Sequence, residues 1–313
     1  MRFLFIMDPI EHIRIDLDST FAMMREAQAR GHEVLYAEVT ALRLEHDEPW
    51  ASVHSCTLGS VQGQHVELSE PFEQPLRALD AIFMRKDPPF NMEYIFATYL
   101  LEAAEPHALV VNRAANLRNH NEKLYALAFP SFCPESLVSA SPKAILRFQD
   151  ALGKSVVVKP LDGNGGEGIF RVNPEDPNRN VILEVSTRHG TRPVIVQRYL
   201  PEAAQGDKRI LMVDGVFEGA ILRVPGATDP RGNLHVGATS QATTLTSREE
   251  ELMTVLGPRF REDGHLFVGL DVIGDFLTEI NVTSPTGIHE VNTLDGRCVE
   301  AAILDAVERK VKG

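Results

Sequence analysis

Cysteine is scarce in this chain, since only three of its 313 residues are cysteines. Cys56, Cys133 and Cys298 lie far apart and have neither the spacing of a metal site nor that of a redox pair. We therefore expect packed or free thiols, and such sparse cysteine favours a cytoplasmic protein over a secreted, disulfide-bonded one.

Long hydrophobic runs are also missing. No apolar stretch approaches the roughly 20 residues that a membrane-spanning helix needs, so we expect no membrane partner. Residues 1–7 contain one basic residue and a short apolar run that ends at Asp8-Pro9. This segment predicts a first β-strand, because a signal peptide needs a longer apolar region and a small-residue cleavage site.

Positive charge is in short supply, since 31 Lys and Arg residues face 44 Asp and Glu residues and the formal net charge is −13. Such an acidic chain is a poor partner for nucleic acid. If its ligands are anionic, lysines and arginines must be gathered locally around them. The contents of 43% hydrophobic and 24% charged residues are otherwise typical of a globular protein, and the length suggests about two domains.

The N-terminal part predicts a parallel, doubly wound α/β sheet. A strand over residues 3–7 is followed by a helix over 19–30, capped by Ser19 or Thr20, and then by a strand over 34–36. There is no Gly-x-Gly-x-x-Gly turn, so a dinucleotide site has no support.

Two cations follow the next buried strand. After a polar, turn-rich stretch that we interpret as a surface meander (45–75), the strand 81–84 leads into Arg85 and Lys86. Open α/β sheets bind ligands at the carboxyl ends of their strands, which favours an anion site here. The alternative is a pair of cations that only solvate a loop.

A glycine-rich loop follows a β-branched strand in the middle of the chain. The strand over 155–160 carries Lys159 near its end, and four glycines fall within the next six-residue window: Gly163, Gly165, Gly166 and Gly168. Glycine loses much entropy on folding, so this run indicates a loop whose backbone N–H groups approach an anion. It is not a Walker loop, because the lysine precedes the glycines. A long hairpin connection is the other interpretation.

The predicted hairpin over 206–224 carries three cations, Lys208, Arg209 and Arg223. Alternation along a strand puts Lys208 and Arg209 on opposite faces, so only some of the three share a cleft. The following residues, 225–240, have no periodicity and many helix and strand breakers, which is typical of a lid, a binding loop or disorder.

The hairpin over 271–281 gathers oxygen ligands. Glu279 and Asn281 are two residues apart and share one face. Asp271 joins that face if Gly274, Asp275 and Phe276 form the loop, whereas a two-residue loop would turn it to the other side. Three such ligands suit a hard cation such as Mg²⁺, although an ordinary polar face gives the same pattern.

Six strings, in unchanged order over nearly the whole chain, closely resemble bacterial glutathione synthetase. They are Met7-Asp8-Pro9-Ile10, Met84-Arg85-Lys86-Asp87-Pro88-Pro89-Phe90, Asn121-Glu122-Lys123, Lys159-Pro160-Leu161-Asp162-Gly163, Gly206-Asp207-Lys208-Arg209, and Gly269-Leu270-Asp271 through Pro285.

The resemblance implies an ATP-grasp fold. It implies a doubly wound α/β substrate-binding domain over residues 1–121 and a central α+β ATP-grasp subdomain with the glycine-rich loop over 122–200. A C-terminal subdomain with the lid and the metal hairpin then covers 201–313.

The same resemblance assigns roles to individual residues. ATP would contact Lys123 and Lys159, the loop glycines Gly163, Gly165, Gly166 and Gly168, and the stretch with Gln197, Tyr199, Leu200 and Asp207. Two Mg²⁺ or Mn²⁺ ions would lie on Asp271, Glu279 and Asn281. The dipeptide would meet Arg85, Asp18, Ser19, Ser284, Arg209 and Arg223, with Lys159, Arg209 and Arg223 acting in catalysis.

The reaction implied is ATP-dependent joining of γ-glutamylcysteine to glycine through an acyl phosphate, by a cytoplasmic homo-tetramer. The 235–240 and 288–294 segments depart from the usual family pattern. Two alternatives are another ATP-grasp ligase, of the D-alanine–D-alanine or peptide-tailoring type, and a non-catalytic ATP-binding regulator. The regulator is disfavoured because the chain keeps every metal and phosphate residue.

Overall fold

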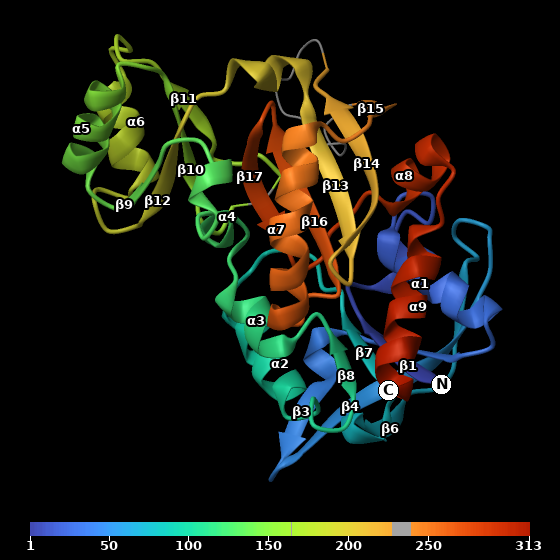
Figure 1. Ribbon diagram of the computed structural model, residues 1–313. Coiled ribbons are helices and arrows are strands. Elements are labelled where there is room, and N and C mark those ends of the chain that lie inside the picture. The colour runs from blue at the N-terminus through green and yellow to red at the C-terminus, as the bar shows by residue number, and fades with distance from the viewer. Residues whose placement is uncertain (164, 227–238) are drawn as a thin grey trace.

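A computed structural model describes residues 1–163, 165–226 and 239–313 of the chain (Figure 1). The fold is mixed α/β, as predicted, and contains three sheets. Within the described residues, no helix combines the length and apolar character that crossing a bilayer requires.

The N-terminal sheet has parallel strands at its centre. Its order is β3 (Leu42–Glu45), β4 (Glu48–Leu58), β2 (Glu33–Ala37), β1 (Arg2–Ile6), β7 (Ala81–Met84) and β8 (Leu109–Val111), with β5 (Val66–Leu68) and β6 (Phe72–Pro75) paired to β4. Strand β1 runs parallel to β2 and β7, and β7 parallel to β8.

Helices cover both faces of this sheet, which makes it doubly wound. Phe3 and Phe5 pack toward α1 (Ser19–Ala29), while Leu4 and Ile6 pack on the opposite side with α2 (Met92–Glu102) and α3 (Ala114–Asn119). The β1 residues from Phe3 to Ile6 are all buried on one face or the other, as the apolar run over 3–7 predicts.

Two sequence predictions in this region were wrong. Residues 45–75 are not a meander, because most of them form β4, β5 and β6, and alternate residues along the first half of β4 are buried. Helix α1 is capped by Asp18 rather than by Ser19 or Thr20, since the Asp18 carboxylate accepts a hydrogen bond from the Phe21 N–H.

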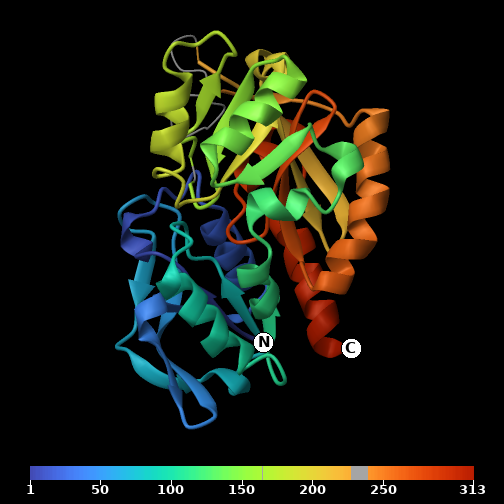
Figure 2. The same cartoon turned by 90° about the vertical axis from the view of Figure 1, so that its left-hand side faces the viewer.

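The central lobe is a small antiparallel sheet with its own core. Its order is β11 (Phe170–Val172), β10 (Val156–Pro160), β12 (Val194–Arg198) and β9 (Ser136–Ser139), and α5 (Pro142–Leu152) and α6 (Arg179–Ser186) pack on it. The lobe stands to one side of the two larger sheets in Figure 1 and lies in front of the C-terminal sheet in Figure 2. Helix α4 (Glu122–Ala126) precedes it and packs on the C-terminal sheet.

The C-terminal sheet is antiparallel, in the order β15 (Thr239–Ala242), β14 (Val216–Val224), β13 (Asp207–Val213), β16 (Phe267–Ile273) and β17 (Phe276–Asn281). Helix α7 (Ser247–Asp263) covers one face. Helices α8 (Ile288–Asp295) and α9 (Val299–Lys312) cover the other, whereas the sequence predicted one closing helix over 295–311.

Short 3-10 turns join several of these elements: Ile10–His12, Val39–Ala41, Leu76–Ala78, Pro130–Phe132 and Pro201–Gln205.

One hydrophobic core links the N-terminal and C-terminal sheets. Phe5 and Phe83 of the first sheet, Leu211 and Phe267 of the last, and Ile303 of α9 belong to the same buried cluster. Helix α9 packs against α1, so the last helix of the chain covers part of the N-terminal domain (Figure 1). None of the described residues of the central lobe belongs to this core.

Gly257 of α7 allows the β13–β14 turn to touch the helix. A Cβ at Gly257 would lie 2.3 Å from the Gly215 carbonyl oxygen, which is backbone and cannot rotate away. We expect Gly257→Ala to lower the free energy of unfolding by about 2 kcal/mol, although alanine is the better helix former. Urea denaturation measures this. Val255→Ala, at an exposed position of the same helix, is the control; equal stability of the glycine variant and wild type would contradict the close contact.

Candidate active site

The site lies on the α8–α9 face of the C-terminal sheet, at the end nearer the central lobe. Along β13, Leu211 and Val213 point into the shared core, while Asp207 and Arg209 share their face farther along the strand. Lys208 points the other way, where its ammonium lies 2.6 Å from a carboxylate oxygen of Glu249 in α7. The predicted split of Lys208 and Arg209 is confirmed.

The metal-ligand hairpin turns on two residues, Gly274 and Asp275, because Ile273 pairs with Phe276. Asp271 nevertheless pairs with Glu279. An irregularity between Val272 and Asp271 leaves Thr278 as an extra residue in β17, and this bulge restores the face that the two-residue turn would have reversed. The expectation that a two-residue loop sends Asp271 to the other side was therefore wrong.

Asp271 is held between two arginines. Its carboxylate forms a two-pronged pair with Arg209, at 2.7 and 3.1 Å, and lies 2.8 Å from Arg223. Burial alone would raise the pKa of Asp271, but the charges of Arg209 and Arg223 outweigh it and hold that pKa well below its usual range. Asp207 accepts two further hydrogen bonds from Arg223.

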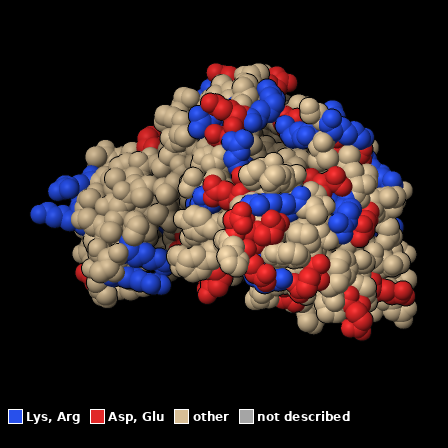
Figure 3. Space-filling view, turned by 90° about the horizontal axis from the view of Figure 1, so that it is seen from below, with Lys and Arg blue, Asp and Glu red and all other residues tan. Residues whose placement is uncertain are grey.

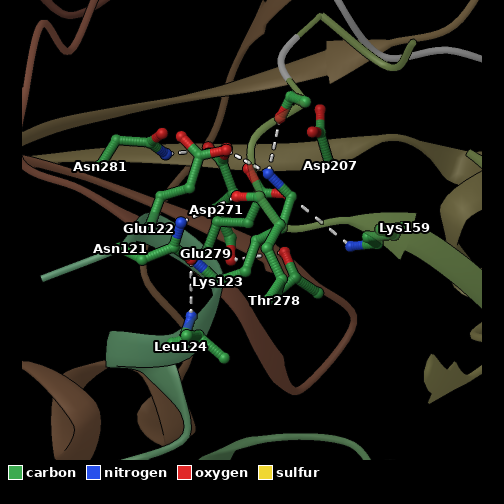
Figure 4. Close-up of polar contacts among 12 residues, drawn as sticks. Asn121, Glu122, Lys123, Leu124, Lys159, Asp207, Asp271, Thr278, Glu279 and Asn281 are labelled. Atoms are coloured by element: carbon green, nitrogen blue, oxygen red, sulfur yellow. Dashed lines mark hydrogen bonds and ion pairs between the residues drawn. The ribbon is translucent and has the colours of Figure 1, made fainter. Parts of the chain in front are cut away.

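Two lysines face Glu279, on the second strand of the hairpin. Lys123 Nζ and Lys159 Nζ lie 3.9 and 3.8 Å from the same Glu279 oxygen, although they come from α4 and β10 (Figure 4). Lys123 also donates to the Gly163 carbonyl at 2.8 Å and pairs with Glu122. The central lobe and the C-terminal sheet thus meet across a row of alternating charges.

Glu122 is a member of this row that sequence reasoning missed. Burial, followed by the negative charge of Glu279, raises the pKa of Glu122 to about 7. The string Asn121-Glu122-Lys123 was recognised, but only its lysine was given a role. The sequence did contain a signal, because Glu122 is adjacent to Lys123. Since Lys123 is buried in α4, a neighbouring carboxylate is expected to lie in the same site.

The glycine-rich loop folds back over its own strand. A Cβ at Gly163 would lie 2.5 Å from the Pro160 ring, so only glycine fits. Gly165, Gly166 and Gly168 have positive φ angles, which other residues rarely adopt. The loop also joins β10 to its antiparallel partner β11, which confirms the hairpin interpretation. That the loop approaches an anion stays a prediction.

The residues predicted to meet adenine lie on and after β12. Gln197 is buried and donates to the Ser136 hydroxyl at 3.2 Å, Leu200 is buried, and the Arg171 guanidinium stacks over the Tyr199 ring at 3.9 Å. Their side chains line the central lobe rather than the charged row.

The acceptor-side residues cluster behind the loop after β17. Arg85 is buried and donates to the Thr20 hydroxyl and the Pro285 carbonyl, at 3.0 and 2.9 Å. Ser284 donates to Asp87 at 2.8 Å. Ser19 is buried too, and Asp18 is occupied as the α1 cap.

The predicted lid, 225–240, falls mostly on residues 227–238, which lie outside the described part of the chain.

The donors fit a hard divalent cation. Asp271, Glu279 and Asn281 offer only oxygen ligands from one sheet face, and the Asn281 amide donates to Asp271 at 3.2 Å, which fixes its orientation. The row has four cations and four carboxylates: Lys123, Lys159, Arg209, Arg223, Glu122, Asp207, Asp271 and Glu279.

A glycine-rich lobe facing an antiparallel sheet, with lysines on one wall and metal-type carboxylates on the other, defines an ATP-grasp enzyme. Solved structures share this architecture at low sequence identity. The D-cycloserine synthetase DcsG has a TM-score of 0.67 and 14% identity, covering 99% of each chain. An ATP-grasp RimK domain protein from Sphaerobacter thermophilus has a TM-score of 0.64 and 20% identity, covering 98% of this chain and 99% of that one.

The sequence comparisons narrow the class. Residues 1–118 match the prokaryotic glutathione synthetase N-terminal domain, and residues 122–296 match the prokaryotic glutathione synthetase ATP-grasp domain. The glutathione synthetase of Gloeobacter violaceus is 47% identical, covering 97% of this chain and 96% of that protein. That of Agrobacterium fabrum is 44% identical, covering 97% and 95%. The chain belongs to the prokaryotic glutathione synthetase family and is an ATP-dependent ligase.

Proposed function

We propose that this cleft joins γ-glutamylcysteine to glycine, forming glutathione, ADP and phosphate. The observation that carries the proposal is the approach of Lys159 Nζ to within 3.8 Å of Glu279, across two lobes. A triphosphate bound there would lie between phosphate-binding lysines and metal-binding oxygens, with arginines next to it. Family membership supports the choice of substrates.

The chain's own residues divide the chemistry. A carboxylate is a poor electrophile, so its oxygen first takes the γ-phosphoryl group and becomes an acyl phosphate. This transfer depends mainly on the positioning of the carboxylate and the triphosphate and on fixed positive charge around them. Lys123 and Lys159 hold the phosphates, and the glycine-rich loop covers them. Arg209 and Arg223 hold the acceptor carboxylate and stabilise the oxyanion formed when the glycine amine attacks.

Two Mg²⁺ or Mn²⁺ ions on Asp271, Glu279 and Asn281 supply further positive charge to the triphosphate. Their oxygen-only donor set supports this choice of metal. The Asp271–Arg209–Arg223 cluster keeps Asp271 ionised, as a ligand must be.

The acceptor would lie against Arg85, Ser284 and the start of α1, with Asp18 and Ser19 shaping that wall. Adenine would lie against Gln197, Tyr199 and Leu200, with Asp207 close to the nucleotide. We keep the predicted division at residues 121 and 200, a cytoplasmic location and a homo-tetramer as parts of the proposal. Analytical ultracentrifugation tests the subunit count.

Phosphate release is expected to require γ-glutamylcysteine, because water is a poor substitute for a carboxylate held on the arginines. Coupled ADP release measures this with ATP alone, with the dipeptide, and with the dipeptide plus glycine. Other acceptors, such as D-alanine or a glutamate-rich peptide, give the matched comparison. Full-rate release with ATP alone, or faster turnover with another acceptor pair, would favour a different ATP-grasp ligase.

A further inference from the structure

A second cluster of metal-type side chains lies beside the charged row and shares no residue with it. His120 follows α3, Asp263 ends α7, and His265 comes two residues later. One ligand atom from each lies within 4.8 Å of the others. His120 Nδ1 and His265 Nε2 are 2.6 Å apart, and Asp263 and His265 are buried.

Neighbouring side chains hold the three ligands in place. The Tyr125 hydroxyl donates to Asp263 Oδ2 at 2.5 Å, and Arg259 donates to the same oxygen at 2.7 Å. The Tyr125 ring stacks on His120 with centroids 3.9 Å apart and planes 6° apart. Metal-binding carboxylates and histidines are oriented by such outer contacts.

The facing ring nitrogens of the two histidines suit a metal ion. Two ring nitrogens this close cannot both carry a hydrogen, so at least one of them has a free lone pair. Burial lowers the pKa of His265 to about 3 and also lowers the pKa of His120. His265 Nδ1 is buried without a hydrogen-bond partner among the described residues, so the contact between the rings does not satisfy His265 by itself.

We propose that His120, Asp263 and His265 bind a divalent transition-metal ion such as Zn²⁺. Two imidazoles and one carboxylate, with an open position for water, are a common zinc set, and the nitrogen donors separate it from the oxygen-only Mg²⁺ site. Ligand atoms around tetrahedral zinc lie roughly 3.3 Å apart, so the two rings separate slightly on binding and Asp263 Oδ1 moves closer.

A bound metal ion would join the segment between α3 and α4 to the end of α7. His120 precedes α4, which carries Lys123, while Asp263 and His265 belong to the C-terminal part. The ion would therefore fix the entry to α4 against the end of α7. His120 also lines a pocket with Asn121, Glu122 and Gly163, so the ion would lie next to the glycine-rich loop.

Cobalt binding tests the site directly. The full chain, freed of metal and kept in excess Mg²⁺ to fill the oxygen ligands, is titrated with Co²⁺, whose visible bands report tetrahedral nitrogen-containing sites. We expect one equivalent to bind and Zn²⁺ to displace it. His265→Gln and Asp263→Asn should each weaken binding about tenfold or more. Circular dichroism checks the fold, and the less buried His120→Gln serves if the other two do not fold.

His107→Gln, at an exposed histidine of the same region, is the matched control and should bind Co²⁺ like wild type. Zn²⁺ should also raise the melting temperature of wild type and of His107→Gln, but not of the cluster variants. Equal Co²⁺ binding by wild type and the cluster variants, or the absence of saturable binding, would overturn the proposal and leave a hydrogen-bonded histidine pair.

Discussion

Lys159→Ala is expected to lower ligase turnover roughly a thousandfold or more, because one fixed charge at a transferring phosphoryl group contributes on that scale. The ammonium lies on the central lobe, 3.8 Å from Glu279, where the two walls of the cleft meet. Most of the loss should appear in kcat, since phosphate charge is most concentrated during transfer. Steady-state kinetics by coupled ADP release measures it.

Lys154→Ala is the matched control, because that lysine is exposed just before the same strand. It should turn over like wild type. Lys159→Arg should recover part of the lost rate, since arginine restores the positive charge but does not place it at the same position as the lysine ammonium. Wild-type activity in Lys159→Ala, with a normal melting curve, would refute the role given to this residue.

Asp271→Asn should reduce both stability and turnover. Two buried arginines lose their shared counter-charge, which costs about 3 kcal/mol of unfolding free energy. The substitution would also weaken one of the proposed metal ligands, so we expect turnover to fall about a hundredfold or more and the Mg²⁺ requirement to rise. Urea denaturation and Mg²⁺ titration measure the two effects. Asp275→Asn, exposed in the turn of the same hairpin, should change neither.

The stability difference between wild type and Asp271→Asn should depend on pH. The pKa of Asp271 is depressed in the folded chain, against about 3.9 when unfolded. Its contribution is therefore full above about pH 4 and is lost as the pH falls through the folded pKa. Burial raises the pKa of Asp207, but Asp207 is present in both proteins. A difference that stays constant below pH 4 would contradict the assignment.

The doubly wound sheet and the hairpins could be predicted because their signals are local. Alternation placed Lys208 and Arg209 on opposite faces, and glycines marked the loop after Lys159. The side of Asp271 could not be predicted, because it depends on a bulge at Thr278 that has no sequence signature of its own. The β4 strand was missed because its buried positions alternate with more exposed ones, so the sequence of this segment resembles that of a surface loop.

The resemblance predicted which residues form the site, but not which of them contact one another. That Asp271 would be shared by Arg209 and Arg223, or that Lys123 and Lys159 would approach one glutamate, depends on packing between segments that lie far apart in the sequence. The same limit hid Glu122 and the histidine cluster. His120 and His265 are 145 residues apart, and only folding brings their rings together.

The first and last sheets share one hydrophobic core, so the boundary predicted near residue 121 does not separate two independently packed units. Hydrogen bonds join Arg85 and Arg209 to the 284–286 loop, although these residues lie far apart in the sequence. The small lobe that carries Lys159 has a hydrophobic core of its own, so a change in its orientation would leave the shared core intact. Such a change would alter the distance from Lys159 to Glu279 without altering the contacts among Arg85, Arg209 and the loop.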